Sequence, residues 1–363
     1  MPPMDVARLV PAQAITIFYR EVALTGAGLV LAALSGLLMR RRPALPAPSA
    51  GPASRRLVLY GLAGLWVLDG LLQLQPAMTT SFLSSVVAPT MQGQPAPVAA
   101  LIAAGVRLWA AHPIGFNVVA VYAQVGIGLA LLLGREDGLR RTALWASLGW
   151  AGLVWVFGEG LGGILSGGSW LAGTPGSAFL YGAGTVLLLL PVDRWAAVAG
   201  RRALAPGLAV FWLGGAVAQA WPPAGYWAPH ALQDAVSAMA QLPQPAALSA
   251  SLAAFAAALA HDPALWNAAI VASLLGLAAA WWRRPDHVAT WIGSGLWAFL
   301  AWWLVQDFGV LGGTGTDPNA GPLEILLIVA YAVAARERGA PRPAPLTARS
   351  RLRLTGAVEG RGA

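Results

Sequence analysis

The stretch IGFNVVAVYAQVGIGLALLLG, residues 114–134, contains no charged side chain and is followed directly by Arg135. As an α-helix, its 21 residues extend over about 31 Å, which matches the ~30 Å hydrocarbon core of a bilayer. A helix satisfies its backbone polar groups internally, so such a stretch can cross a bilayer without a partner. The stretch therefore predicts a transmembrane helix.

The composition of the whole chain points to the same class of protein. Hydrophobic residues make up 57% of the 363 residues, charged residues make up 10%, and the mean hydropathy is +0.63. A water-soluble protein cannot cover its surface with so few charges. The composition therefore predicts an all-α, polytopic transmembrane helix bundle that has the lipid bilayer as its first partner. The absence of cysteine excludes disulfides and thiolate metal sites.

Eight further apolar stretches are long enough to be spans, which makes about nine in all. They are residues 22–39, 57–75, 142–158, 177–192, 203–221, 264–282, 288–305 and 322–335. Two shorter apolar pieces, residues 98–111 and 246–260, follow proline-rich loops. We expect these two pieces to form interfacial or re-entrant helices.

The arginines test this number of spans independently. All 23 basic residues are arginine, and with the N-terminus outside only Arg8, Arg20 and Arg107 lie on the outer side. Cytoplasmic loops carry the excess of positive charge in membrane proteins. The sequence thus predicts an N-out, C-in protein, and its arginine-, alanine- and glycine-rich composition suggests the cytoplasmic (inner) membrane of a bacterium. The net charge of +8 reflects the inner segments and does not indicate a nucleic-acid partner.

Three segments of the first half of the chain recur in the second half in the same order. They pair LWVLDGLLQLQP (65–76) with FWLGGAVAQAWP (211–222), GQPAPVAALIAAGVRLWAAHPIGFN (93–117) with PQPAALSASLAAFAAALAHDPALWN (243–267), and WVFGEGLGG (155–163) with WLVQDFGVLGG (303–313). Each copy contains four spans, an even number, so both copies enter the membrane in the same orientation. The matches predict two parallel four-helix repeats related by a pseudo-twofold axis along the membrane normal.

On this prediction, the chain divides into four segments. Residues 1–56 hold an outer segment, the first span and a basic linker, and residues 57–200 and 201–338 form the two membrane repeats. Residues 339–363 are rich in arginine and proline, which is typical of a disordered cytoplasmic tail.

Each repeat gathers a histidine, an asparagine and an acid near the outer membrane surface. The first repeat supplies His112, Asn117 and Glu159, and the second repeat supplies His261, Asn267 and Asp307. Glycines follow each acid and can expose backbone amides to a ligand. Two interpretations stay open: a ligand-binding cluster, or helix capping and interfacial hydrogen bonds without a ligand.

Asp69 lies deeper in its predicted span, and Gln73 lies one turn further out on the same helix face. Gln219 corresponds to Gln73 in the second repeat. An ionisable residue inside a membrane span is a functional candidate by default, although a protonated structural acid is an equal alternative. Arg107 is positioned to neutralise Asp69 or Glu159.

No pattern in the sequence specifies a catalytic residue, a metal or a cofactor. The chain lacks HExxH and CxxC motifs, and its glycine-rich stretches match neither a phosphate-binding loop nor a dinucleotide fingerprint.

The order of one span, an outer loop with a short helix and three more spans resembles the DoxX-type four-helix membrane family, here occurring twice. The residues that carry the resemblance are LWVLDGLL (65–72) and FGEGLGGILSGG (157–168), with degenerate second copies. The phrases GTPGSAFLY (173–181) and TDPNAGPLEILL (316–327) are more similar to uncharacterised bacterial multi-pass proteins. The DoxX resemblance implies a membrane redox or quinone-linked role with a membrane or extracytoplasmic redox partner, and it assigns no catalytic residue.

Two function hypotheses follow from these patterns. The first is a membrane subunit or accessory protein with an outward-facing polar pocket for a quinone-like lipophilic ligand or a partner. The second is a small-solute or ion transporter that uses the repeat interface, with Asp69, Glu159 and Asp307 as coupling acids. An enzyme that works at the outer face is a further alternative, and the sequence leaves its substrate open.

Overall fold

The computed structural model describes residues 11–39, 51–134, 138–197 and 202–339, and within these ranges the protein contains helices and no strand. The all-α fold class is therefore confirmed for the described chain. Three of the described helices are long and apolar enough to cross a membrane: α1 (Pro11–Met39), α5 (Pro113–Leu133) and α12 (Pro263–Arg283). The predicted topology-fixing linker and arginine-rich tail lie largely outside the described residues, at 40–50 and 340–363.

Each of the nine predicted spans coincides with a helix. Besides α1, α5 and α12, these helices are α2 (Ala53–Leu72), α6 (Leu139–Leu153), α7 (Ser177–Leu189), α9 (Leu204–Ala220), α13 (Val288–Leu304) and α14 (Gly321–Gly339). The π-helical turn η4 (Val154–Gly158) extends α6. Helix α1 begins at Pro11, well before the predicted residue 22, because the polar pair Arg20 and Glu21 interrupts the apolar run without breaking the helix.

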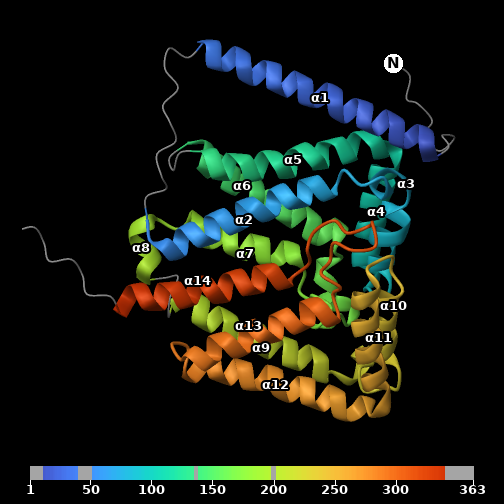
Figure 1. The fold of residues 1–363 in the computed structure, drawn as a ribbon, viewed down its shortest axis with the longest axis vertical. Helices are drawn as coiled ribbons and strands as arrows, with labels where there is room; N and C mark the ends of the chain where they lie inside the picture. Colours follow the sequence, from blue (N-terminus) through green and yellow to red (C-terminus); the bar gives the residue numbers. More distant parts are fainter. Residues whose placement is uncertain (1–10, 40–50, 135–137, 198–201, 340–363) are drawn as a thin grey trace, which may run out of the picture.

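At one end of the bundle, α4 (Ala96–Ala111) and α11 (Ala246–His261) run crosswise to the helices that coincide with the predicted spans (Figure 1). We refer to this end as the α4–α11 end. The elements that precede them are α3 (Ala77–Thr80), η2 (Leu83–Val87) and η3 (Ala88–Met91) before α4, and η7 (Pro222–Ala224) and α10 (Ala231–Ala240) before α11. A short helix α8 (Val192–Ala197) lies at the opposite end (Figure 1).

Buried tryptophans connect the long helices. The indole of Trp66 on α2 donates a hydrogen bond to Ser147 Oγ on α6 at 2.9 Å, and the indole of Trp281 on α12 donates to Ser294 Oγ on α13 at 2.8 Å. A buried tryptophan is stable when its apolar rings are packed and its one donor has an acceptor, and both conditions are met here. These contacts fix the relative positions of helices that are apolar on most of their surface.

Candidate functional site

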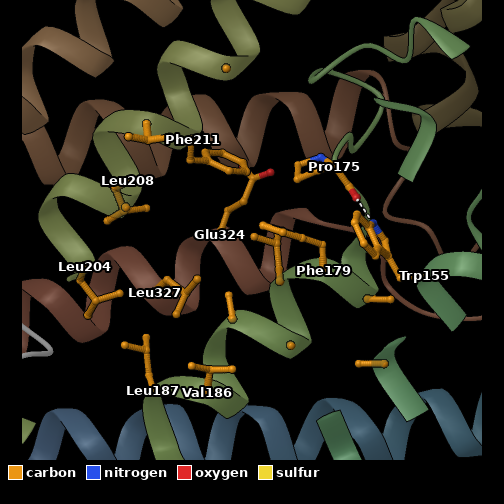
Figure 2. Close-up of a pocket in the computed structure, with 18 of the residues that line it drawn as sticks. Trp155, Pro175, Phe179, Val186, Leu187, Leu204, Leu208, Phe211, Glu324 and Leu327 are labelled. Carbon is orange, nitrogen blue, oxygen red and sulfur yellow. Dashed lines mark hydrogen bonds between the residues drawn. The ribbon is translucent and has the colours of Figure 1, made fainter. Parts of the chain in front are cut away.

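A pocket of about 920 Å³ lies between α6, α7, α9 and α14. Its lining is almost entirely apolar, and Figure 2 shows side chains of these helices converging on it. The lining residues are Leu148, Ala151, Gly152, Trp155, Ile164, Trp170, Pro175, Ala178, Phe179, Leu180, Gly182, Ala183, Val186, Leu187, Ala203, Leu204, Pro206, Gly207, Leu208, Val210, Phe211, Gly214, Glu324 and Leu327. None of the ten site residues predicted from the sequence is among them.

The pocket is continuous with the apolar flank of the bundle. On its two helical walls, three large apolar lining side chains are well exposed: Phe179 at 42%, Val186 at 49% and Val210 at 63%. They belong to α7 and α9, which form facing walls of the pocket. A molecule that approaches from the side of the bundle therefore reaches the pocket across apolar surface.

One carboxyl group enters this apolar space. Glu324 lies in the first turn of α14, is only 4% exposed and is the one charged side chain among the described lining residues. Within the described chain, its carboxyl group forms no hydrogen bond or ion pair. Figure 2 shows the carboxyl between Phe211 and Pro175. Glu324 was not among the predicted site residues, although it is the only acid in the predicted span 322–335 and an acid inside a membrane span is a functional candidate by default.

The wall of the pocket near the α4–α11 end is held in place by two polar contacts. The indole of Trp155 donates to the carbonyl oxygen of Pro175 at 2.8 Å (Figure 2). On the other side of the wall, Glu159 Oε1 accepts hydrogen bonds from Ser177 Oγ at 2.6 Å and from the backbone N–H of Ala178 at 3.0 Å. The predicted site residue Glu159 therefore supports the pocket through the start of α7 and does not face it.

Glu159 sits in an acidic environment that the sequence did not predict. Burial raises the pKa of the Glu159 carboxyl to about 7, and the nearby charge of Asp317 adds to the rise, whereas the hydrogen bonds from Ser177 and Ala178 oppose it. Burial also raises the pKa of Asp317, whose carboxylate accepts the backbone N–H of Asn319 at 2.6 Å. Asp317 comes from the loop before α14, so the two acids are brought together only by the fold.

Asp69 is fully buried on α2, and its Oδ2 accepts a 2.5 Å hydrogen bond from the hydroxyl of Tyr181 on α7. Tyr181 lies between the lining residues Leu180 and Gly182 but does not itself line the pocket, so α7 separates Asp69 from it. Gln73 is also buried, and its amide donates to the carbonyl oxygen of Thr316 at 3.3 Å. Asp69 and Gln73 therefore hold the loop before α14 and the helix α7 against α2.

The predicted neutralisation of an acid by Arg107 is not found. Arg107 is exposed on α4, and within the described ranges it forms no ion pair with Asp69 or Glu159. The histidines His112 and His261 are likewise exposed, at the ends of α4 and α11. In the described part of the chain, no three His, Asp or Glu side chains are grouped as metal ligands.

The two predicted asparagines are buried and make structural hydrogen bonds. Asn117 donates to the carbonyl oxygens of Met78 at 2.6 Å and Pro113 at 2.8 Å. Asn267 accepts a 2.8 Å hydrogen bond from the amide of Gln219, and Gln219 accepts one from Ser169 Oγ at 2.8 Å. These contacts anchor the loops at the α4–α11 end, in line with the interpretation that does not need a ligand.

Asp307 does not make the contact that Glu159, its counterpart in the sequence match, makes. Its backbone is left-handed, with φ of 48°, and burial raises the pKa of its carboxyl group. The contact that corresponds to that of Glu159 is made by the preceding residue: Gln306 Oε1 accepts the backbone N–H of Gly321 at 3.3 Å, at the start of α14. By its hydrogen bond, Gln306 therefore corresponds to Glu159 more closely than Asp307 does.

No protein-family model, curated protein or solved structure matches the chain.

Proposed function

We propose that this chain is an integral membrane protein that binds a lipophilic ligand taken up sideways from the bilayer. The observation that carries the proposal is the pocket between α6, α7, α9 and α14, which is apolar and open across the exposed side chains of Phe179, Val186 and Val210. Ligand pockets for small molecules have volumes of roughly 300–1,000 Å³ and are lined mostly by apolar and aromatic side chains. The pocket of about 920 Å³ fits an amphiphile with a ring-sized head and part of its chain.

In this proposal the nine helices that coincide with the predicted spans cross the inner membrane of a bacterium, and the N-terminus lies outside. The α4–α11 end then faces outward, and the crosswise helices α4 and α11 lie at the interface (Figure 1). The apolar residues on the flank of the bundle, such as Leu296 on α13 and Val217 on α9, contact lipid. Such exposure is normal for a bilayer-facing helix and unusual for a water-facing one.

Repeated contacts support the duplicated architecture. Trp155 donates to the carbonyl oxygen of Pro175 at 2.8 Å, and Trp302 donates to that of Pro318 at 2.7 Å. The hydrogen bond of Glu159 with the start of α7 has its counterpart in that of Gln306 with the start of α14. In a duplicated chain the pocket lies between the repeats, because α6 and α7 belong to the first and α9 and α14 to the second.

The resemblance to DoxX-type subunits extends the proposal to a quinone-like ligand and a redox partner at the outer face. The apolar lining is compatible with an isoprenoid chain. One observation also favours the alternative of a transporter: the pocket with its single acid lies where two repeats would move against each other. Transport predicts solute-dependent flux in proteoliposomes, whereas a binding subunit gives none.

Filling the pocket tests the proposed function directly. Gly207 on α9 lines the pocket, and a Cβ atom there would meet nothing within 4 Å. We expect Gly207→Phe to keep the fold and to place its ring in the pocket. Mass spectrometry of lipid extracts from the purified protein is then expected to find a lipophilic molecule with the wild type and at least about tenfold less of it with the variant.

Gly276→Phe is the matched control. Gly276 is an exposed helical glycine of α12, also with nothing within 4 Å of a Cβ atom, and it does not line the pocket. The control is expected to retain the ligand at the wild-type level. The proposal is overturned if the wild type and Gly207→Phe carry the same molecules in the same amounts.

A further inference from the structure

We propose that the pocket selects amphiphiles with a cationic head, which pairs with the carboxylate of Glu324. This inference rests on the proposed function, because it names the chemical class of the ligand that enters the same pocket. It is carried by the position of Glu324, which is 4% exposed and directed into an apolar pocket without a partner among the described residues.

The surroundings of Glu324 leave its charge without compensation from the described part of the protein. A buried carboxylate in an apolar environment is costly unless it is paired. The pocket offers no basic side chain and no hydrogen-bond donor to this carboxyl group within the described residues. Two other buried acids accept hydrogen bonds within the protein: Asp69 from Tyr181, and Glu159 from Ser177 and Ala178. The carboxyl oxygens of buried Asp307 accept none from the described residues, but Asp307 does not line the pocket. Glu324 is the unpaired acid that faces the pocket, and a cationic ligand supplies the missing partner.

The start of α14 favours the negative charge at this position. Glu324 lies in the first helical turn, where the exposed N–H groups of the helix favour an anion. When the Glu324 carboxyl is ionised, the pocket is negative at one point and apolar elsewhere. That charge pattern attracts a lipophilic cation and rejects fatty acids and anionic phospholipid heads.

Aromatic rings in the same pocket complete the site. Phe179, Phe211, Trp155 and Trp170 all line the pocket, and the rings of Trp170 and Phe211 pack with centroids 5.5 Å apart. Figure 2 shows Phe211 and Phe179 near Glu324, and Trp155 farther away, beyond Pro175. Aromatic faces bind ammonium and other organic cations through the ring quadrupole, and this attraction is strongest where water is excluded. A carboxylate in a pocket that also contains aromatic rings therefore recognises the cation, and the apolar walls recognise its hydrophobic body.

Equilibrium binding to the purified full-length protein in detergent tests the inference with two probes. Tetraphenylphosphonium represents a lipophilic cation, and decylubiquinone represents a neutral amphiphile. The wild type is expected to bind tetraphenylphosphonium saturably, and Glu324→Gln is expected to weaken this binding at least about thirtyfold, as for other buried charge pairs that lose one partner. Glutamine has nearly the same shape as glutamate, so a folded Glu324→Gln variant removes the charge without changing the volume of the pocket.

Two further variants complete the experiment. Glu21→Gln makes the same chemical change on α1, outside the pocket, and is expected to leave tetraphenylphosphonium binding unchanged. Gly207→Phe is expected to abolish it. Equal tetraphenylphosphonium binding by wild type and Glu324→Gln overturns the inference. The inference is also overturned if the wild type binds decylubiquinone but not tetraphenylphosphonium. If Gly207→Phe then blocks the binding of decylubiquinone, the proposed function is retained and only the preference for a cationic ligand is lost. If neither probe responds to Gly207→Phe, the proposed function itself fails.

Discussion

Gly162→Ala is expected to destabilise the protein by about 3–5 kcal/mol or to prevent it from folding. Gly162 has a φ of 61°, and an added Cβ atom would overlap the carbonyl group of Pro175. The two backbone segments would have to separate, which breaks the hydrogen bond from Trp155 to Pro175 and moves the residues that Glu159 holds. Thermal unfolding in detergent, followed by tryptophan fluorescence, measures the loss, and size-exclusion chromatography measures the folded yield.

Gly149→Ala is the matched control for this prediction. Gly149 is exposed on α6, and a Cβ atom there would meet nothing within 4 Å. Alanine has the higher helix propensity, so this variant is expected to gain up to about 1 kcal/mol of stability. The interpretation of the Gly162 segment is wrong if the two variants unfold at the same temperature.

Glu159→Gln is expected to remove a large part of the pH dependence of stability. The pKa of Glu159 is raised from its ordinary value of 4.5 to about 7, so the folded protein binds more protons than the unfolded chain between these values. The free energy of unfolding therefore falls as the pH rises from 4.5 to 7, by about 3 kcal/mol for this group, and the stabilising effect of the proton is complete only below pH 4.5. Glutamine has no proton to lose in this range.

The thermal midpoint of unfolding measured from pH 4 to pH 8.5 checks this expectation. The variant is expected to unfold close to the wild type at the acidic end and at a higher temperature above pH 7. Its amide oxygen can still accept the N–H of Ala178, as that of Gln306 accepts the N–H of Gly321. Glu21→Gln, which removes an acid from a surface ion pair, is the control and is expected to follow the wild type. Parallel curves for wild type and Glu159→Gln would assign the pH dependence to another group.

The helices were predictable because their signal is local. The apolar run of residues 114–134 predicts a helix without reference to any other part of the chain, and the structure places α5 at Pro113–Leu133. The short apolar pieces were predicted as separate helices because their length falls below that of a span, and α4 and α11 match them. The start of α1 was missed because hydropathy does not register a helix that carries a charged pair such as Arg20 and Glu21.

The structure places the polar candidates at buried positions or near helix ends and does not bring all of them together in one site. Asn117, Asn267 and Gln219 are buried and hydrogen-bonded within the protein, whereas His112, His261 and Arg107 are exposed. Sequence spacing predicts the position of a residue along its helix, but it only weakly predicts which residue of another helix or loop it will contact. Weak identity also allowed the match of Glu159 with Asp307, one residue away from the position that makes the corresponding hydrogen bond.

The amino-acid sequence by itself determined the all-α fold class and the approximate positions of the helices along the chain, because hydropathy and helix length act within a single segment. Only the tertiary structure decided where an open space remains between α6, α7, α9 and α14, and that Glu324 points into it alone. It also decided that Asp317 lies close to Glu159. Both outcomes depend on how helices and loops far apart in the chain pack against one another. Residues far apart in the sequence contact one another only after the chain has folded, so the sequence pattern of one segment does not reveal these contacts.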